Sequence, residues 1–124
     1  KDGIYAASLL VEMMAVSGKK LSEIAEDIRK EYGEIHMEER AYRFTAEEKE
    51  RIHKTLMMDQ ALPEIPFEID HVSYMDGCKV YLKNGGWVSA RFSGTEPLLR
   101  IFCEMQTEHE AVLLCEVFEK FLGL

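Results

Sequence analysis

A run near the end of the chain that is apolar at every second residue is the feature that most constrains its fold. In "LLRIFCEM", residues 98–105, the apolar residues Leu99, Ile101, Cys103 and Met105 alternate with arginine, phenylalanine and glutamate. A β-strand has a period of two, so this pattern places four apolar side chains on one face of a sheet. Such a face must be covered, because apolar surface is stabilised by removal from water. The pattern therefore predicts a sheet with one face packed against other elements.

Two shorter runs of the same kind precede this segment. "CKVYL" at 78–82 follows the turn sequence "MDG", "WVSARF" at 87–92 follows "NGG", and a further alternation begins at Phe67. Alternating runs separated by glycine-containing turns are typical of antiparallel hairpins. Pro63 and Pro66 exclude a continuous helix or a central strand just before them. These residues predict a connector followed by an antiparallel sheet.

Helix start signals lie on both sides of these strands. Thr45 is followed three residues later by Glu48, and Thr107 is followed by Glu110 in the same way. A threonine with a glutamate at this spacing can satisfy the free amides at the start of a helix reciprocally. We predict one helix from Thr45 to about Asp59 and a second helix at the C-terminal end.

A domain boundary is predicted near Gly33. Residues 34–44 alternate between apolar and charged side chains and are expected to form a strand. Residues 34–124 therefore read as an α+β domain, an antiparallel sheet with two helices packed on one face. Residues 1–33 read as two helices that precede it.

The first helical segment is apolar on most of its circumference. Asp2 can cap it, and Glu12 is its only charged residue before Gly18. A helix of this kind is normally buried on several sides. The chain begins at Lys1 rather than at a methionine, so we interpret it as a fragment. We expect residues 1–17 to expose apolar surface and to promote dimerisation.

Charge and composition exclude several classes of protein. The chain has 15 Lys and Arg against 23 Asp and Glu, a net charge of -8, which argues against a nucleic-acid partner or an anionic membrane surface. No run of eighteen apolar residues and no basic leader is present, which predicts neither a membrane span nor a signal peptide. The three cysteines form no C-x-x-C pair, which indicates reduced thiols in the cytoplasm.

An anion site is predicted at "RFSGTEPLLR", residues 91–100. If the strands on either side are neighbours, Arg91 leaves the sheet at the edge where Arg100 enters it, and the two guanidinium groups can converge. Ser93 and Thr95 add hydroxyl donors, and Gly94 permits backbone angles that turn successive amides toward one point. Guanidinium groups match the oxygens of a phosphate bidentately. The set is suited to a phosphorylated metabolite.

A simpler interpretation stays open and is favoured by composition alone. The string can be an ordinary turn whose arginines make surface ion pairs, which contribute about 0–1 kcal/mol each. Glu96 would repel a phosphate, so we expect it to turn outward or to hold one of the arginines. No histidine follows Ser93 closely enough to suggest a hydrolase nucleophile, and the four histidines lack metal-ligand spacing. We therefore predict no catalytic residue and no metal site.

The string "RFSGTEPLLRIF" resembles the phosphate-binding loop of the α-D-phosphohexomutases. "DGIYAASLLVEMMA" resembles the helix that ends the third domain of that family, and "QTEHEAVLLCEVFEKFL" resembles the close of the fourth. The resemblance implies that residues 1–33 are the helical remnant of the third domain. It also implies that residues 34–124 are the fourth domain, whose fold is similar to the TATA-binding protein.

The resemblance further implies a role for the loop. Enzymes of the family interconvert hexose 1-phosphate and 6-phosphate and use Mg²⁺ and a hexose bisphosphate activator. The family's motifs for the chemical step and for Mg²⁺ are absent here, so this chain alone is expected to be inactive. The implied phosphate contacts are Arg91, Ser93, Gly94 and Thr95, with Arg100 as an additional contact. The implied partners are a phosphosugar and the missing N-terminal domains. "DGIYAA" favours the phosphoglucomutase/phosphomannomutase branch; a phosphoglucosamine mutase, or a non-catalytic binding or regulatory module on the same fold, are the alternatives.

Overall fold

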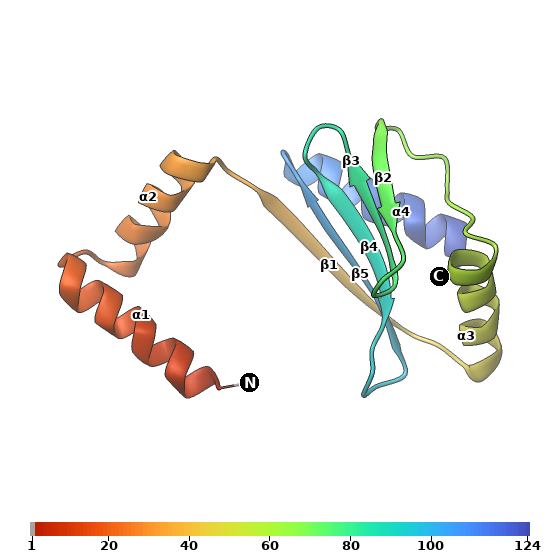
Figure 1. Ribbon diagram of the computed structural model, residues 1–124, viewed down its shortest axis with the longest axis horizontal. Coiled ribbons are helices and arrows are strands. Elements are labelled where there is room, and N and C mark those ends of the chain that lie inside the picture. The colour runs from red at the N-terminus through yellow and green to blue at the C-terminus, as the bar shows by residue number, and fades with distance from the viewer. Residues whose placement is uncertain (1) are drawn as a thin grey trace. The chain divides into compact units, whose positions relative to one another are not determined.

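The computed structural model describes residues 2–124 and divides them into two units, the first ending at Glu34 and the second spanning Ile35–Leu124. The first unit contains the helices α1, Gly3–Ser17, and α2, Leu21–Tyr32 (Figure 1). The second unit contains all the strands and the remaining helices. No helix among the described residues has the length and apolar character needed to cross a membrane.

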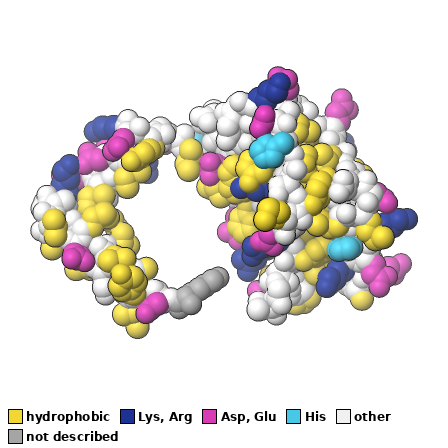
Figure 2. Space-filling model, viewed as in Figure 1, with side chains coloured by type: hydrophobic (Ala, Val, Ile, Leu, Met, Phe, Trp, Pro, Cys, Tyr) yellow, Lys and Arg dark blue, Asp and Glu magenta, His cyan; other side chains and the backbone are white. Residues whose placement is uncertain are grey.

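Helix α1 is well capped but has no buried side chain of its own. Asp2 accepts a hydrogen bond from the Tyr5 amide at 2.9 Å, and Gly18 ends the helix with a φ of 67°. Ile4 and Val16 are each 83% exposed, and Figure 2 shows the hydrophobic side chains of this unit at its surface. The predicted exposure of apolar surface is confirmed, and the dimerisation expected from it stays a prediction.

The second unit is built on one five-stranded sheet. Its strands are β1, His36–Arg43; β2, Ile69–Ser73; β3, Cys78–Leu82; β4, Trp87–Phe92; and β5, Leu98–Met105. Their spatial order is β1-β5-β4-β3-β2, and every neighbouring pair is antiparallel. The predicted α+β fold with an antiparallel sheet is confirmed.

Both predicted helices of this unit begin where their capping residues lie and pack on the same face of the sheet (Figure 1). Helix α3, Ala46–His53, starts after Thr45, whose hydroxyl accepts from the Glu48 amide at 3.3 Å while the Glu48 carboxylate accepts from the Thr45 amide at 2.7 Å. These hydrogen bonds lower the pKa of Glu48. Helix α4, Glu108–Leu122, starts after Thr107, whose hydroxyl accepts from the Glu110 amide at 3.2 Å. The Glu110 carboxylate accepts from that hydroxyl at 2.9 Å rather than from the Thr107 amide, so the reciprocal cap predicted here forms only in part.

The helix predicted to run to about residue 59 changes type before its end. After α3 the chain forms a π-helical turn, η1, Lys54–Met58, in which the Asp59 amide donates to the Lys54 carbonyl at 2.9 Å. A π-turn admits an extra residue without breaking the helix. Leu56, within this turn, is buried at 1% exposure. The predicted extent of this element is therefore right, and the expectation of a uniform α-helix is wrong.

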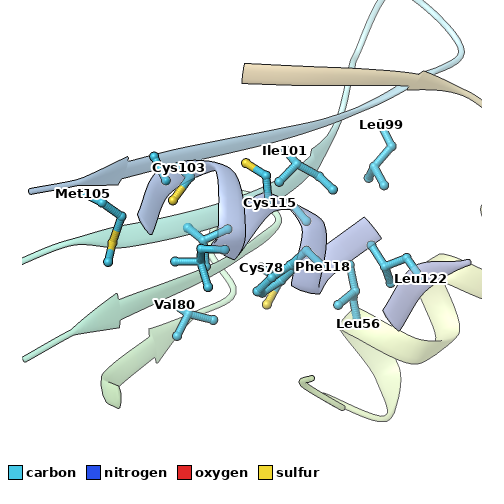
Figure 3. Packing of buried hydrophobic residues seen from close by; sticks show 14 of the residues in the cluster. Leu56, Cys78, Val80, Leu99, Ile101, Cys103, Met105, Cys115, Phe118 and Leu122 are labelled. Atoms are coloured by element: carbon cyan, nitrogen blue, oxygen red, sulfur yellow. The ribbon is translucent and has the colours of Figure 1, made fainter. Parts of the chain in front are cut away.

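The core lies between the sheet and these helices (Figure 3). The four alternating apolar residues of β5 are at most 1% exposed. They pack against the inward sides of β3, β4, α3, η1 and α4 through Ile52, Leu56, Cys78, Val80, Leu82, Val88, Ala90, Ala111, Leu114, Cys115, Phe118 and Leu122. All three cysteines are free and buried, and burial raises the pKa of the Cys78 thiol to about 11. The period-two pattern therefore assigns the core face correctly.

Candidate anion site

The strand register places the two predicted arginines side by side. In the β4/β5 ladder Arg91 pairs with Arg100, and Phe92 pairs with Leu99. Directly opposed residues of an antiparallel pair project from the same face of the sheet. Leu99 and Ile101 face the helices, so both arginines project from the other side. We call that side, which carries Lys79, Tyr81, Trp87, Ser89, Arg91, Arg100 and Phe102, the open face.

The loop between these strands holds a row of unused hydrogen-bond donors. Its ends are closed by the Ser93 amide donating to the Leu98 carbonyl at 2.7 Å and by the Leu98 amide donating to the Glu96 carbonyl at 2.8 Å. Within residues 2–124, the amides of Gly94, Thr95 and Glu96 and the hydroxyls of Ser93 and Thr95 donate to no protein acceptor. The exposed part of the loop therefore offers donors that no acceptor of the described chain occupies.

Gly94 does not adopt the left-handed backbone angles on which the predicted nest of amides depends. The two backbone hydrogen bonds at the base of the loop close it without such angles. A Cβ atom built on Gly94 meets no atom within 4 Å. Packing within the chain therefore does not require glycine at position 94, and the space beside its Cα atom is open.

The base of the loop is held by an aromatic group on the helix side. Phe92 meets Phe44 edge to face with ring centroids 5.3 Å apart and stacks on His53 at 6.4 Å, with the Lys49 ammonium 5.9 Å from its ring. The Phe44 amide also donates to the Pro97 carbonyl at 3.4 Å. These contacts connect the loop to the end of β1 and to α3, so the loop extends from a supported base.

Each arginine has an acidic neighbour. Arg91 Nη1 donates to Asp76 Oδ2 at 2.7 Å, whereas Arg100 lies 3.8 Å from Glu39 and 3.6 Å from Glu96. Glu96 thus lies at ion-pair distance from one of the arginines, which is one of the two placements expected for it. Arg91 is 50% exposed and Arg100 is 37% exposed. Such exposed pairs contribute about 0–1 kcal/mol each, so an incoming dianion can compete with the carboxylates.

Arg100 also has a shielded donor. Its Nε atom is buried and has no hydrogen-bond partner among the described residues. An unsatisfied buried donor is unfavourable by about 1–3 kcal/mol. Since Nε is shielded, the terminal nitrogens are the part of Arg100 that a ligand can reach. The sequence pattern alone carries no signal of this difference between the two arginines.

Beside Arg91 the open face has a hollow. Among the residues that line it, the sequence patterns single out Arg91 but not Asp76 or Lys79. Lys79 Nζ lies 3.7 Å from the centroid of Trp87 and 4.7 Å from that of Tyr81, and these residues line the hollow together with Arg91 and Asp76. Because the ammonium already covers Trp87, this ring packs on the sheet rather than presenting a free stacking surface. The "MDG" turn is the one sequence signal near Asp76 and Lys79.

Magnesium does not fit the described part of this chain. Residues 2–124 contain no group of three or more His, Cys, Asp or Glu side chains that could hold a metal ion. No step is therefore assigned here to the Mg²⁺ that the family resemblance implies.

Two family models match the chain. The model described as "Phosphoglucomutase/phosphomannomutase, C-terminal domain" matches residues 45–120. The model described as "Phosphoglucomutase/phosphomannomutase, alpha/beta/alpha domain III" matches residues 1–32. The first match contains the loop and both arginines, and the second contains α1 and α2.

Curated relatives and a solved structure agree with these matches. The chain is 33% identical, over 98% of its length, to "Phosphoglucomutase/phosphomannomutase" of Thermococcus kodakarensis, and 32% identical, over 89% of its length, to "Probable phosphoglucosamine mutase" of Methanothermobacter thermautotrophicus. It covers 24% and 23% of those proteins, about a quarter of their length. The crystal structure of a "putative phosphomannomutase" from Thermus thermophilus aligns over 100% of this chain and 23% of its own, with a TM-score of 0.65 and 22% identity, and supports the fold.

Proposed function

The chain belongs to the phosphoglucomutase/phosphomannomutase family, and we propose that its second unit holds the phosphate group of a hexose phosphate within a longer mutase. The observation that carries this proposal is the pairing of Arg91 with Arg100 on the open face, next to a loop with unused donors. We call Arg91, Ser93, Gly94, Thr95 and Arg100 the phosphate clamp. Charge-assisted hydrogen bonds from such groups are about twice as strong as neutral ones.

The clamp consists of donors and contributes binding and orientation. By gripping the phosphate that does not react, it supplies binding energy remote from the reacting phosphate and orients the sugar. Recognition of a phosphate by guanidinium, amide and hydroxyl donors is indifferent to the stereochemistry of the sugar behind it. The same clamp can therefore hold a hexose phosphate by either end, as interconversion of 1- and 6-phosphates requires.

The chemical step is proposed to lie in the rest of the longer mutase, together with the Mg²⁺ and the hexose bisphosphate. No described residue is proposed to act as nucleophile, acid or base. The apolar surface of α1 is proposed to be covered by the rest of the third domain, since residues 1–32 match that domain. The enzyme is proposed to work in the cytoplasm, in keeping with its three free thiols.

The sugar is proposed to be glucose or mannose, with glucosamine as the second candidate. The relative from Thermococcus kodakarensis carries a phosphoglucomutase/phosphomannomutase name, whereas those from Geobacillus kaustophilus and Methanothermobacter thermautotrophicus carry phosphoglucosamine mutase names. Turnover of glucose 1-phosphate and of glucosamine 1-phosphate by the full-length mutase discriminates the two. Absence of turnover with both of these sugars and with mannose 1-phosphate would favour the non-catalytic module.

Arg91→Ala in the full-length mutase tests the clamp. Loss of a charge-assisted contact is expected to raise KM for glucose 1-phosphate by about tenfold to a hundredfold. Lys83→Ala is the matched control, because Lys83 is a similarly exposed cation in the turn after β3, paired with Glu68 and absent from the clamp. An unchanged KM in Arg91→Ala would remove the role proposed for this arginine.

A further inference from the structure

The turn between β2 and β3 is seated directly on the backbone of Arg91. Gly77, in this turn, has a φ of +83°, a conformation that side-chain-bearing residues rarely adopt. A Cβ atom at Gly77 would lie 2.5 Å from the Ala90 carbonyl oxygen and 3.0 Å from Cα and Cβ of Arg91. Only glycine therefore allows the turn to come this close to the strand that carries Arg91.

This contact places the Asp76 carboxylate beside the Arg91 side chain. Asp76 immediately precedes Gly77, and its Oδ2 accepts a hydrogen bond from Arg91 Nη1 at 2.7 Å. A guanidinium has five N–H donors, so one contact leaves four of them available. Asp76 can therefore orient Arg91 without using up its capacity to bind an anion.

We propose that Asp76 is a positioning residue of the phosphate clamp: it holds one corner of the Arg91 guanidinium and leaves the other donors of this group to the ligand. This inference rests on the proposed function and adds a residue to it. A free arginine side chain populates many rotamers, and ordering it before the ligand arrives reduces the entropy lost on binding. Asp76 carries a negative charge, but it is exposed, so its repulsion of a phosphate is screened by solvent.

Two other ion pairs show why this one differs. Glu96 lies in the same loop as the proposed ligand contacts and is 3.6 Å from Arg100, so no separate element supports it. Glu68 pairs with Lys83 at the far end of the β2–β3 hairpin, with similar exposure but away from the clamp. The Asp76 pair alone, among these three, joins a clamp residue to a turn whose position is fixed by a backbone contact.

The test compares Asp76→Ala with Asp76→Asn in the full-length mutase, with glucose 1-phosphate as the probe. Asp76→Ala is expected to raise KM about threefold to fivefold, the range of an exposed ion pair, with kcat within twofold of wild type. Asp76→Asn keeps an acceptor oxygen and removes the charge, so its KM is expected to stay within twofold of wild type. Glu68→Ala, the matched control, is expected to leave KM unchanged.

A double-mutant cycle completes the test. In the Arg91→Ala background, Asp76→Ala is expected to produce no further rise in KM, because its partner is absent.

An unchanged or lower KM in Asp76→Ala, while Arg91→Ala raises KM, would overturn the positioning role and leave the clamp intact. A further rise in the Arg91→Ala background would also overturn it. An unchanged KM in Arg91→Ala would overturn the clamp and this inference together. Asp76 is 74% exposed, so its variants are expected to fold, which thermal unfolding checks.

Discussion

The two faces of the sheet in the second unit differ in burial and in the kind of residue that they carry. On the helix-covered face Ile101 is fully buried, whereas on the open face its neighbour Arg100 is 37% exposed and holds ion pairs. One step along β5 thus separates a side chain that stabilises the fold from one proposed to bind substrate. A residue's position in the period-two alternation therefore decides whether its substitution lowers the free energy of unfolding or weakens substrate binding.

Ile101→Ala is expected to give the largest loss of stability. Truncating a fully buried isoleucine removes apolar contacts and leaves a cavity, which lowers the free energy of unfolding by about 2–5 kcal/mol. Urea denaturation followed by the fluorescence of Trp87, the single tryptophan of the chain, reports on this unit. Ile101→Val is the matched control, expected to lose about 0.5–1.5 kcal/mol. A loss below that range in Ile101→Ala would break the distinction between the faces.

Arg100→Ala is expected to show the opposite pattern. The free energy of unfolding should change by less than about 1 kcal/mol, because the ion pairs of Arg100 are partly exposed. KM of the full-length mutase for glucose 1-phosphate should rise by about tenfold or more, for a lost contact to a charged ligand. Arg43→Ala on edge strand β1 is the comparison variant. A stability loss as large as that of Ile101→Ala, with KM unchanged, would show that Arg100 stabilises the fold and does not bind the substrate.

Gly94→Ala is expected to affect binding alone. The added methyl group meets no atom within 4 Å, so the free energy of unfolding should stay within about 0.5 kcal/mol. A methyl group in the space where a phosphate approaches should raise KM by about tenfold. Gly85→Ala is the reverse control: its φ of 88° disfavours alanine, so stability should fall while KM is retained. Normal KM in Gly94→Ala would remove Gly94 from the clamp.

Thr107→Ala is expected to give the smallest effect and to act on stability only. Its hydroxyl accepts from the Glu110 amide at 3.2 Å at the start of α4, and loss of such a cap lowers the free energy of unfolding by about 1 kcal/mol. Thr107→Ser keeps the hydroxyl and should retain most of that stability. A change in KM without a change in stability would show that α4 contributes to the site as well as to the covered face.

Local signals in the sequence anticipated most elements of the fold. The capping residues Asp2, Thr45 and Thr107 start their helices, and the alternation in β5 assigns its four core residues. The π-turn after His53 was not anticipated, because its hydrogen bonds between residues five apart leave no distinct periodic signature in so short a segment.

The sequence by itself determined which residues become strands, which sides of them are apolar and which stretch carries the donors of the clamp, because these depend on neighbours along the chain. Only the tertiary structure decided the strand order, the register that sets Arg91 against Arg100, and the seating of Gly77 on the Arg91 backbone. These features join residues from different elements, and the packing of the whole sheet selects them. Asp76 therefore became visible as a partner of Arg91 only in the folded chain.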